Sequence, residues 1–155
     1  MTRGHAGFCA CLAMVLALTG CAASGPASGL HAPEGRWQIV DHRIGPVSAM
    51  RESDAEAWHG RALEFRSGSA QLADRNCEQP LYEHRLVEPD AYLGENYRLS
   101  TADRQRLRRS DGLLQVTDVI CEGRSADALG GTLLWISEDR VMTPWDGVLF
   151  ELQRQ

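Results

Sequence analysis

Apolar and polar residues alternate over many short stretches of this chain, a pattern typical of half-buried β-strands. We expect strands at residues 36–41, 61–66, 70–72, 113–121, 132–136, 140–142 and 148–152. Residues 113–121 are the clearest strand, because β-branched side chains are frequent there and Gly112 and Gly123 lie on either side. Gly130-Gly131 and Asp146-Gly147 are expected turns, and Pro144 is expected to end the strand that begins at Arg140.

Helical signals are few. Ser53 and Glu56 have the spacing of a capping box, and Gly60 is suited to ending the short helix that would follow. Residues 100–109 have two interpretations: Ser100 caps a short helix, or the alternating charges of 104–109 lie on a strand. Residues 76–80 are expected to be irregular, and residues 81–97 to form loops with one broken strand or helix.

Short strands about ten residues apart, separated by glycine turns, favour an antiparallel fold over βαβ units. The sequence therefore predicts a mainly β protein, a small antiparallel barrel or sandwich of the lipocalin-like kind with one or two short helices. We expect one domain at residues 35–155, since about 135 residues suffice for a single core. Residues 21–34 are rich in Ala, Ser, Gly and Pro and are expected to be a flexible tether.

The first 20 residues have the layout of a secretory signal peptide. Arg3 and His5 precede an apolar run at residues 8–18, which is too short to span a bilayer as a permanent helix. Leu18-Thr19-Gly20-Cys21 then resembles the lipobox of bacterial lipoproteins. The resemblance implies cleavage after Gly20, acylation at Cys21 and anchoring in a membrane, and Ala22 in place of Asp implies the inner leaflet of the outer membrane, facing the periplasm. The alternative is an ordinary secretory signal cut near residues 22–23.

The remaining cysteines form a simple set once the leader is removed. Cys9 and Cys11 leave with the leader, and Cys21 carries the lipid. Cys77 and Cys121 are then an even pair in an oxidising compartment, where a disulfide is the expected state. A metal site on these two thiols is the weaker alternative, because neither has a Cys or His nearby at ligand spacing.

A second, looser resemblance covers residues 35–152. Gly35-Arg36-Trp37, the Cys-x-x-Pro at residues 77–80 and Trp145-Asp146-Gly147 resemble features of small lipocalin-like envelope lipoproteins. This resemblance implies a β fold and carries no active site.

Charge and motifs exclude several function classes. The net charge of −5 argues against a general nucleic-acid binder, whose affinity depends on neutralising phosphates. His42, His59 and His84 lack metal-ligand spacing, so no metal or cofactor is expected. We find no Gly-x-Ser-x-Gly nucleophile elbow and assign no catalytic residue.

Two groups of residues are candidate binding features. Arg104, Arg106, Arg108 and Arg109 form the densest basic cluster, which either grips anionic groups such as phosphates or guards a solvated edge strand. The second group, Trp135, Met142 and Trp145, either lines a ligand cavity or fills the core, and core packing is the commoner role.

These observations predict a non-enzymatic, membrane-anchored periplasmic binding domain. Its partner would be an envelope protein, which it recognises or inhibits, as an inhibitor of lysozymes or proteases would, through a rigid loop that we expect around residues 81–97. One alternative is a carrier of a small apolar ligand inside the barrel, which requires a hollow interior. Another is a hydrolase whose catalytic groups are scattered in the sequence and meet in the fold.

Overall fold

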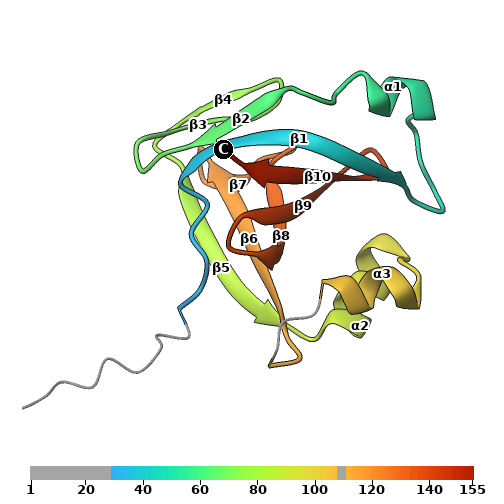
Figure 1. The fold of residues 1–155 in the computed structure, drawn as a ribbon. Helices are drawn as coiled ribbons and strands as arrows, with labels where there is room; N and C mark the ends of the chain where they lie inside the picture. The colour runs from blue at the N-terminus through green and yellow to red at the C-terminus, as the bar shows by residue number, and fades with distance from the viewer. Residues whose placement is uncertain (1–28, 108–110) are drawn as a thin grey trace, which may run out of the picture.

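The computed structural model describes residues 29–107 and 111–155. Within these residues, ten antiparallel strands form one strongly curled sheet, a half-barrel with three short helices beside it (Figure 1). The prediction of a mainly β, antiparallel fold is confirmed. The sheet stays open between its two outer strands rather than closing into a barrel, and it carries three helices instead of one or two.

The elements follow one another as β1 (Gly35–Ile44), α1 (Glu52–Glu56), β2 (Ala62–Phe65), β3 (Ser69–Gln71), β4 (Asn76–Glu78), β5 (Leu81–Val87), α2 (Pro89–Tyr97), α3 (Thr101–Arg106), β6 (Leu114–Cys121), β7 (Arg124–Ser125), β8 (Thr132–Ser137), β9 (Arg140–Trp145) and β10 (Val148–Arg154). Across the sheet the order is β4-β3-β2-β1-β10-β9-β8-β6-β5, with β7 paired to β6. The strands β8, β9 and β10 form a meander, and β1 returns from the start of the domain to lie beside β10.

Both faces of the sheet bury apolar side chains. The concave face holds an inner core that includes Trp37, Ile39, Leu63, Phe65, Val119, Leu133, Trp135, Val141, Phe150 and Leu152. On the convex face lies an outer core of Leu93, Leu99, Leu107, Leu114, Val116, Leu134, Met142 and Leu149. Residues 114–119 of β6 are all buried because this strand contributes alternate side chains to the two faces.

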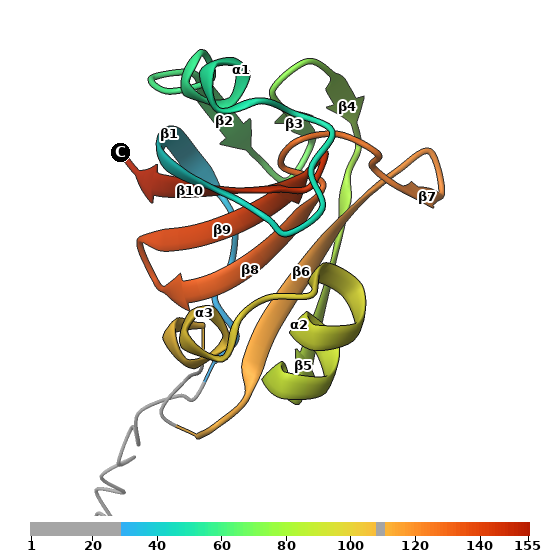
Figure 2. The same cartoon turned by 90° about the vertical axis from the view of Figure 1, so that its right-hand side faces the viewer.

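Helices α2 and α3 cover the outer core. Figure 2 shows them beside each other at one end of the sheet, next to β5, β6 and β8. The Glu88 carboxylate accepts a hydrogen bond from the Ala91 amide at the start of α2, and the Ser100 hydroxyl accepts one from the Asp103 amide at the start of α3. The helical interpretation of this second segment is thus correct for Thr101–Arg106, and the strand alternative is wrong there.

Three local expectations about helices and strands need correction here. Helix α1 begins at Glu52, so Ser53 is not its cap. The Arg51 carbonyl accepts the Ala55 amide, and the N-cap is therefore Arg51, two residues before Ser53. Asn76–Glu78, expected to be irregular, forms the edge strand β4 against β3. Residues 81–97 form a regular strand and a helix.

Pro144 does not end its strand. It lies inside β9 opposite Leu149, whereas the pairing of β9 with β8 stops at Met142. The missing N–H of proline therefore costs no ladder hydrogen bond on the β8 side.

Part of the predicted tether is attached to the domain. The His31 ring stacks on Trp135 at 5.1 Å between centroids. The His31 amide donates to Gln115 Oε1 at 2.8 Å, and Gln115 Nε2 donates to the His31 carbonyl at 2.6 Å. Arg154 also donates to the carbonyls of Ala32 and Glu34. The domain thus includes residues 31–34, which precede the expected boundary at Gly35.

A disulfide joins Cys77 of β4 to Cys121 at the end of β6, with their Cα atoms 5.6 Å apart. It ties the outer strand β4 to the other side of the opening in the half-barrel. A disulfide in this domain points to an extracytoplasmic location, without naming the compartment. Within residues 29–107 and 111–155, no helix is long and apolar enough to span a membrane.

Candidate functional site

A groove of about 560 Å³ lies at one end of the half-barrel, within the range usual for ligand sites. Its lining consists of Thr132 at the start of β8 and four segments: residues 45–47 after β1, 96–99 at the end of α2, 126–128 before β8, and 144–149 around the turn between β9 and β10. The groove therefore joins parts of the chain that are far apart in sequence.

The turn at Asp146-Gly147 holds one wall of the groove. Both residues have positive φ, 48° and 79°, as a type I′ turn requires. The Gly147 carbonyl accepts the Gly45 amide at 2.8 Å, and the Asp146 carbonyl accepts the Ala49 amide at 3.0 Å. A side chain at Gly147 would collide with the Val47 carbonyl. Only glycine thus allows the loop after β1 to approach the turn so closely.

The opposite wall is the C-terminal end of α2. Arg98 adopts the left-handed conformation with φ 53°, and its amide donates to the Gly94 carbonyl at 3.2 Å. The next amide, of Leu99, donates to the Leu93 carbonyl at 3.3 Å, and the Leu99 side chain belongs to the outer core. This wall is therefore anchored by the same packing that holds α2 on the sheet.

The groove combines apolar surface with polar groups. Val47 is 67% exposed, the most exposed large apolar side chain among the described residues, and Trp145 is half-buried beside it in the lining. Asn96 and Asp127 offer an amide and a carboxylate along the same lining. Such a surface suits a ligand that presents both apolar side chains and peptide groups.

Tyr97 contributes a neutral phenol to the groove. Burial, together with its hydrogen bond to Tyr92, raises the pKa of Tyr97 well above its usual range. The two rings pack edge to face at 5.9 Å between centroids. Arg85 donates to the Tyr92 hydroxyl at 3.0 Å and pairs with Asp118. This chain of contacts links the groove to the outer strand β5.

A second hollow, of about 630 Å³, lies beside the disulfide. It is lined by residues 75–78, 121–122 and 124–127, most of them polar or charged and none aromatic. It lacks the apolar anchoring surface of the first groove, which is therefore the better candidate for specific binding.

The chain matches no protein-family model, no curated protein and no solved structure. Each candidate site is therefore judged by the geometry of its own residues.

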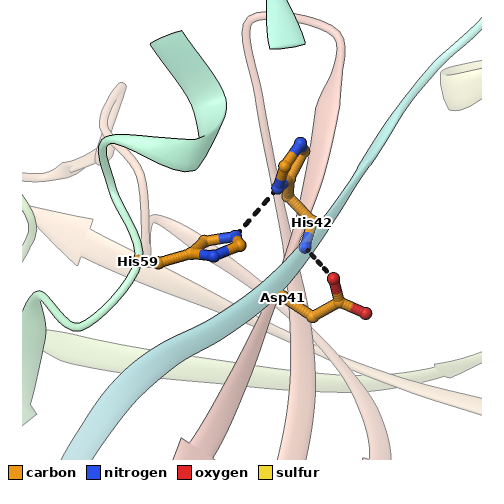
Figure 3. A group of neighbouring side chains, drawn as sticks. All are labelled: Asp41, His42 and His59. Carbon is orange, nitrogen blue, oxygen red and sulfur yellow. Dashed lines mark hydrogen bonds between the residues drawn. The ribbon is translucent and has the colours of Figure 1, made fainter. Parts of the chain in front are cut away.

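The structure brings two of the three mid-chain histidines together. His42 Nδ1 lies 2.8 Å from His59 Nε2, and Asp41 lies next to them (Figure 3). Sequence spacing could not reveal this group, because the two histidines are 17 residues apart on different elements. His84 is elsewhere, with its Nδ1 2.8 Å from the Thr117 hydroxyl.

The predicted basic cluster is only partly described. Arg104 lies on α3 and is turned toward α2 and its own helix: Nη1 donates to the Asp90 carbonyl at 3.4 Å and Nη2 to the Thr101 hydroxyl at 3.1 Å. Arg106 is on the same helix. Arg108 and Arg109 lie outside the described residues. For Arg104, therefore, the structure shows contacts that join α2 to α3.

Trp135, Met142 and Trp145, the candidate lining of a ligand cavity, lie in different parts of the structure. Trp135 lies in the inner core and Met142 in the outer core, so these two fill cores. Trp145 is half-buried: it packs against the inner core and also lines the groove. The recognition loop expected at residues 81–97 is replaced by β5 and α2, and only the end of α2 reaches the groove. Cys21, the expected lipid site, lies outside the described residues.

Proposed function

We propose that this chain is a bacterial envelope lipoprotein, anchored through Cys21 in the inner leaflet of the outer membrane, whose β domain binds an extended segment of a partner protein. The lipobox-like Leu18-Thr19-Gly20-Cys21 supports the anchor. The disulfide supports a location where thiols are oxidised. The role is one of binding, without a catalysed reaction.

The groove is the observation that carries this proposal. Its walls are held by backbone hydrogen bonds and by the outer core, so it needs little ordering when a ligand binds. Val47 and Trp145 give an apolar anchor, and the Asn96 side chain can both donate to and accept from a peptide backbone. An extended polypeptide offers these two kinds of group in alternation.

The two alternatives receive less support. A carrier needs room inside the half-barrel, but Trp37, Phe65, Trp135 and Phe150 fill the concave face at 1% exposure or less. A hydrolase needs a nucleophile and a base in reach of each other in a cleft. The described lining of the groove holds neither a histidine nor a cysteine.

The binding proposal is tested by photo-crosslinking in cells of the native host. A photoreactive amino acid at position 47 is expected to give a discrete protein adduct, whereas the same group at position 81 is not. Leu81 is a fitting control because it is also an exposed apolar residue, at 58%, and does not line the groove.

Competition sharpens this test when the crosslinking is repeated in a detergent extract of the host envelope, where added protein can reach the partner. Excess purified wild-type protein and its Leu81→Asp variant should both suppress the adduct, while Val47→Asp should not, because it puts a charge on the apolar anchor. Equal adducts at positions 47 and 81, or suppression by all three competitors alike, would argue against a specific groove.

The anchor is tested by fractionation. The wild-type protein should sediment with outer membranes, and Cys21→Ser should not, because stable anchoring takes acyl chains at this residue. If both fractionate with membranes in the same way, the lipoprotein proposal is wrong even where the groove proposal stands.

A further inference from the structure

His42 and His59 are held against each other by the fold. His42 lies near the end of β1, where its ring packs near Phe150 at 6.2 Å between centroids. His59 follows α1, and the loop that carries it is fastened to β1: the Gly60 amide donates to the Ile39 carbonyl at 2.8 Å. These contacts bring His42 Nδ1 within 2.8 Å of His59 Nε2 (Figure 3).

Two carboxylates lie beside the histidine pair: Asp41 is near both rings, and Glu52 contacts the far side of the His42 ring. Asp41 has an oxygen within 4.8 Å of one ring nitrogen of each histidine. Glu52 Oε1 lies 3.0 Å from the opposite nitrogen of the His42 ring, Nε2. Since a carboxylate accepts hydrogen bonds at this spacing, we assign the His42 proton to Nε2. The lone pair of His42 Nδ1 then accepts the N–H of His59 Nε2, and an ion can take this place once His59 carries its proton on Nδ1 instead.

This arrangement is the one that metal-binding histidines adopt. A ligating histidine usually donates its remote N–H to a carboxylate, which fixes the tautomer and makes the other nitrogen a better ligand. A β-bulge between Ile39 and Asp41 shifts the register of β1 against β10 just before the cluster. A bulge turns side chains out of their regular alternation, and here consecutive residues 41 and 42 both reach the cluster.

We propose that Asp41, His42 and His59 bind a divalent first-row transition ion of the Zn²⁺ or Cu²⁺ kind, with Glu52 as a positioning residue behind His42. Two imidazole nitrogens and one carboxylate oxygen are the donors that these ions prefer, whereas Mg²⁺ and Ca²⁺ prefer oxygen alone. Asp41 and Glu52 together match the charge of the ion. Three protein ligands leave a coordination position open.

To admit the ion, the two ring nitrogens must separate, and the Asp41 carboxylate, whose Oδ1 accepts the His42 amide at 2.8 Å, must turn toward them from a distance of up to 4.8 Å. Two nitrogens at about 2.05 Å from a tetrahedral ion lie about 3.3 Å apart, so the present 2.8 Å must widen by roughly half an ångström. His59 can supply this movement because its side chain is exposed. His42 can stay in place, with only 5% of its side chain exposed.

The test is titration of the full-length protein, purified in detergent, with Zn²⁺ and separately with Cu²⁺ in a calorimeter. We expect one equivalent of ion to bind at this site, and no binding of Mg²⁺. His59→Ala should abolish that binding. Glu52→Gln, which keeps a hydrogen-bond acceptor but removes the charge, should weaken it about 10- to 100-fold. His84→Gln, on a histidine bound to Thr117 instead, is the matched control and should bind as the wild type does.

His59→Ala is preferred to a change of the buried His42 because it should leave the apo protein's melting temperature unchanged. Nuclear magnetic resonance of the imidazole nitrogens provides a readout that needs no substitution. Zn²⁺ should shift Nδ1 of His42 and Nε2 of His59 and leave His84 unaffected. The proposal is overturned if neither ion binds the wild type, if His59→Ala binds as tightly as the wild type, or if the ion shifts only other histidines. None of these results bears on the groove.

Discussion

Removing the disulfide should cost this domain a large part of its stability. The perturbation is the double substitution Cys77→Ser with Cys121→Ser. Cys77 is only 3% exposed and belongs to β4, which is held to the sheet by three residue pairs with β3. Cys121 closes β6, so the bridge fastens a weakly held outer strand to a well-buried one.

The magnitude follows from the length of chain that the bridge closes. The two cysteines are 44 residues apart. In the chain-entropy treatment, closing a loop of this length lowers the conformational entropy of the unfolded chain and so raises the free energy of unfolding by about 4 kcal/mol. Total unfolding free energies of single domains are about 5–15 kcal/mol. We therefore expect the serine pair to lose roughly a third to most of the stability of the domain.

The assay is equilibrium unfolding in urea, followed by tryptophan fluorescence. The midpoint should fall in the double variant, and amide hydrogens of Asn76–Glu78 should exchange faster than those of β1, because β4 loses its second attachment. The matched control is the double alanine variant, which lacks the buried hydroxyls and should show a similar loss. A loss under about 1 kcal/mol in both variants would refute the reasoning.

Three further outcomes are expected. Burial raises the pKa of Tyr82 to about 12, so on raising the pH the phenol ionises in the unfolded chain before it does in the folded one, and stability present below pH 10 is lost as the pH rises toward 12. Over this range the melting temperature should fall less steeply in Tyr82→Phe than in the wild type, and equal slopes would contradict the assignment. Leu93→Ala should destabilise by about 2–5 kcal/mol in urea unfolding, because Leu93 is fully buried under α2, and a change below about 1 kcal/mol would show that the outer core contributes little. Gln115→Ala should cost about 1–3 kcal/mol and speed hydrogen exchange at the His31 amide, since both hydrogen bonds to His31 are lost; an unchanged exchange rate would mean that residues 31–34 are held by other contacts.

Local sequence signals were reliable where the local environment decides the outcome. The alternation around Trp37 and Ile39 predicted the first strand, and the turn at Asp146-Gly147 has the backbone that its residues favour. Ser100 capped a helix as its type predicts. Where two signals competed, as at Ser53, the backbone hydrogen bonds that the Arg51 carbonyl accepts prevailed over the capping pattern.

The same reasoning failed where partners come from distant parts of the chain. Pro144 continues its strand because β8 offers no partner beside it, and no feature of the local sequence carries that information. Asn76–Glu78 is a strand because β3 pairs with it. The His42–His59 contact requires β1 and the loop after α1 to meet, so a search for short ligand spacing cannot find it.

By itself, then, the sequence determined that this chain folds as antiparallel β-structure and that Cys77 and Cys121 make a plausible pair. The first depends on the two-residue period of a strand, which is a local property, and the second on the number of cysteines left once the leader is removed. Only the tertiary structure decided that the sheet remains open and where the groove and the histidine group are formed. Those features depend on which strands pair and on how far the sheet curls, because side chains more than ten residues apart meet only after the whole sheet has formed.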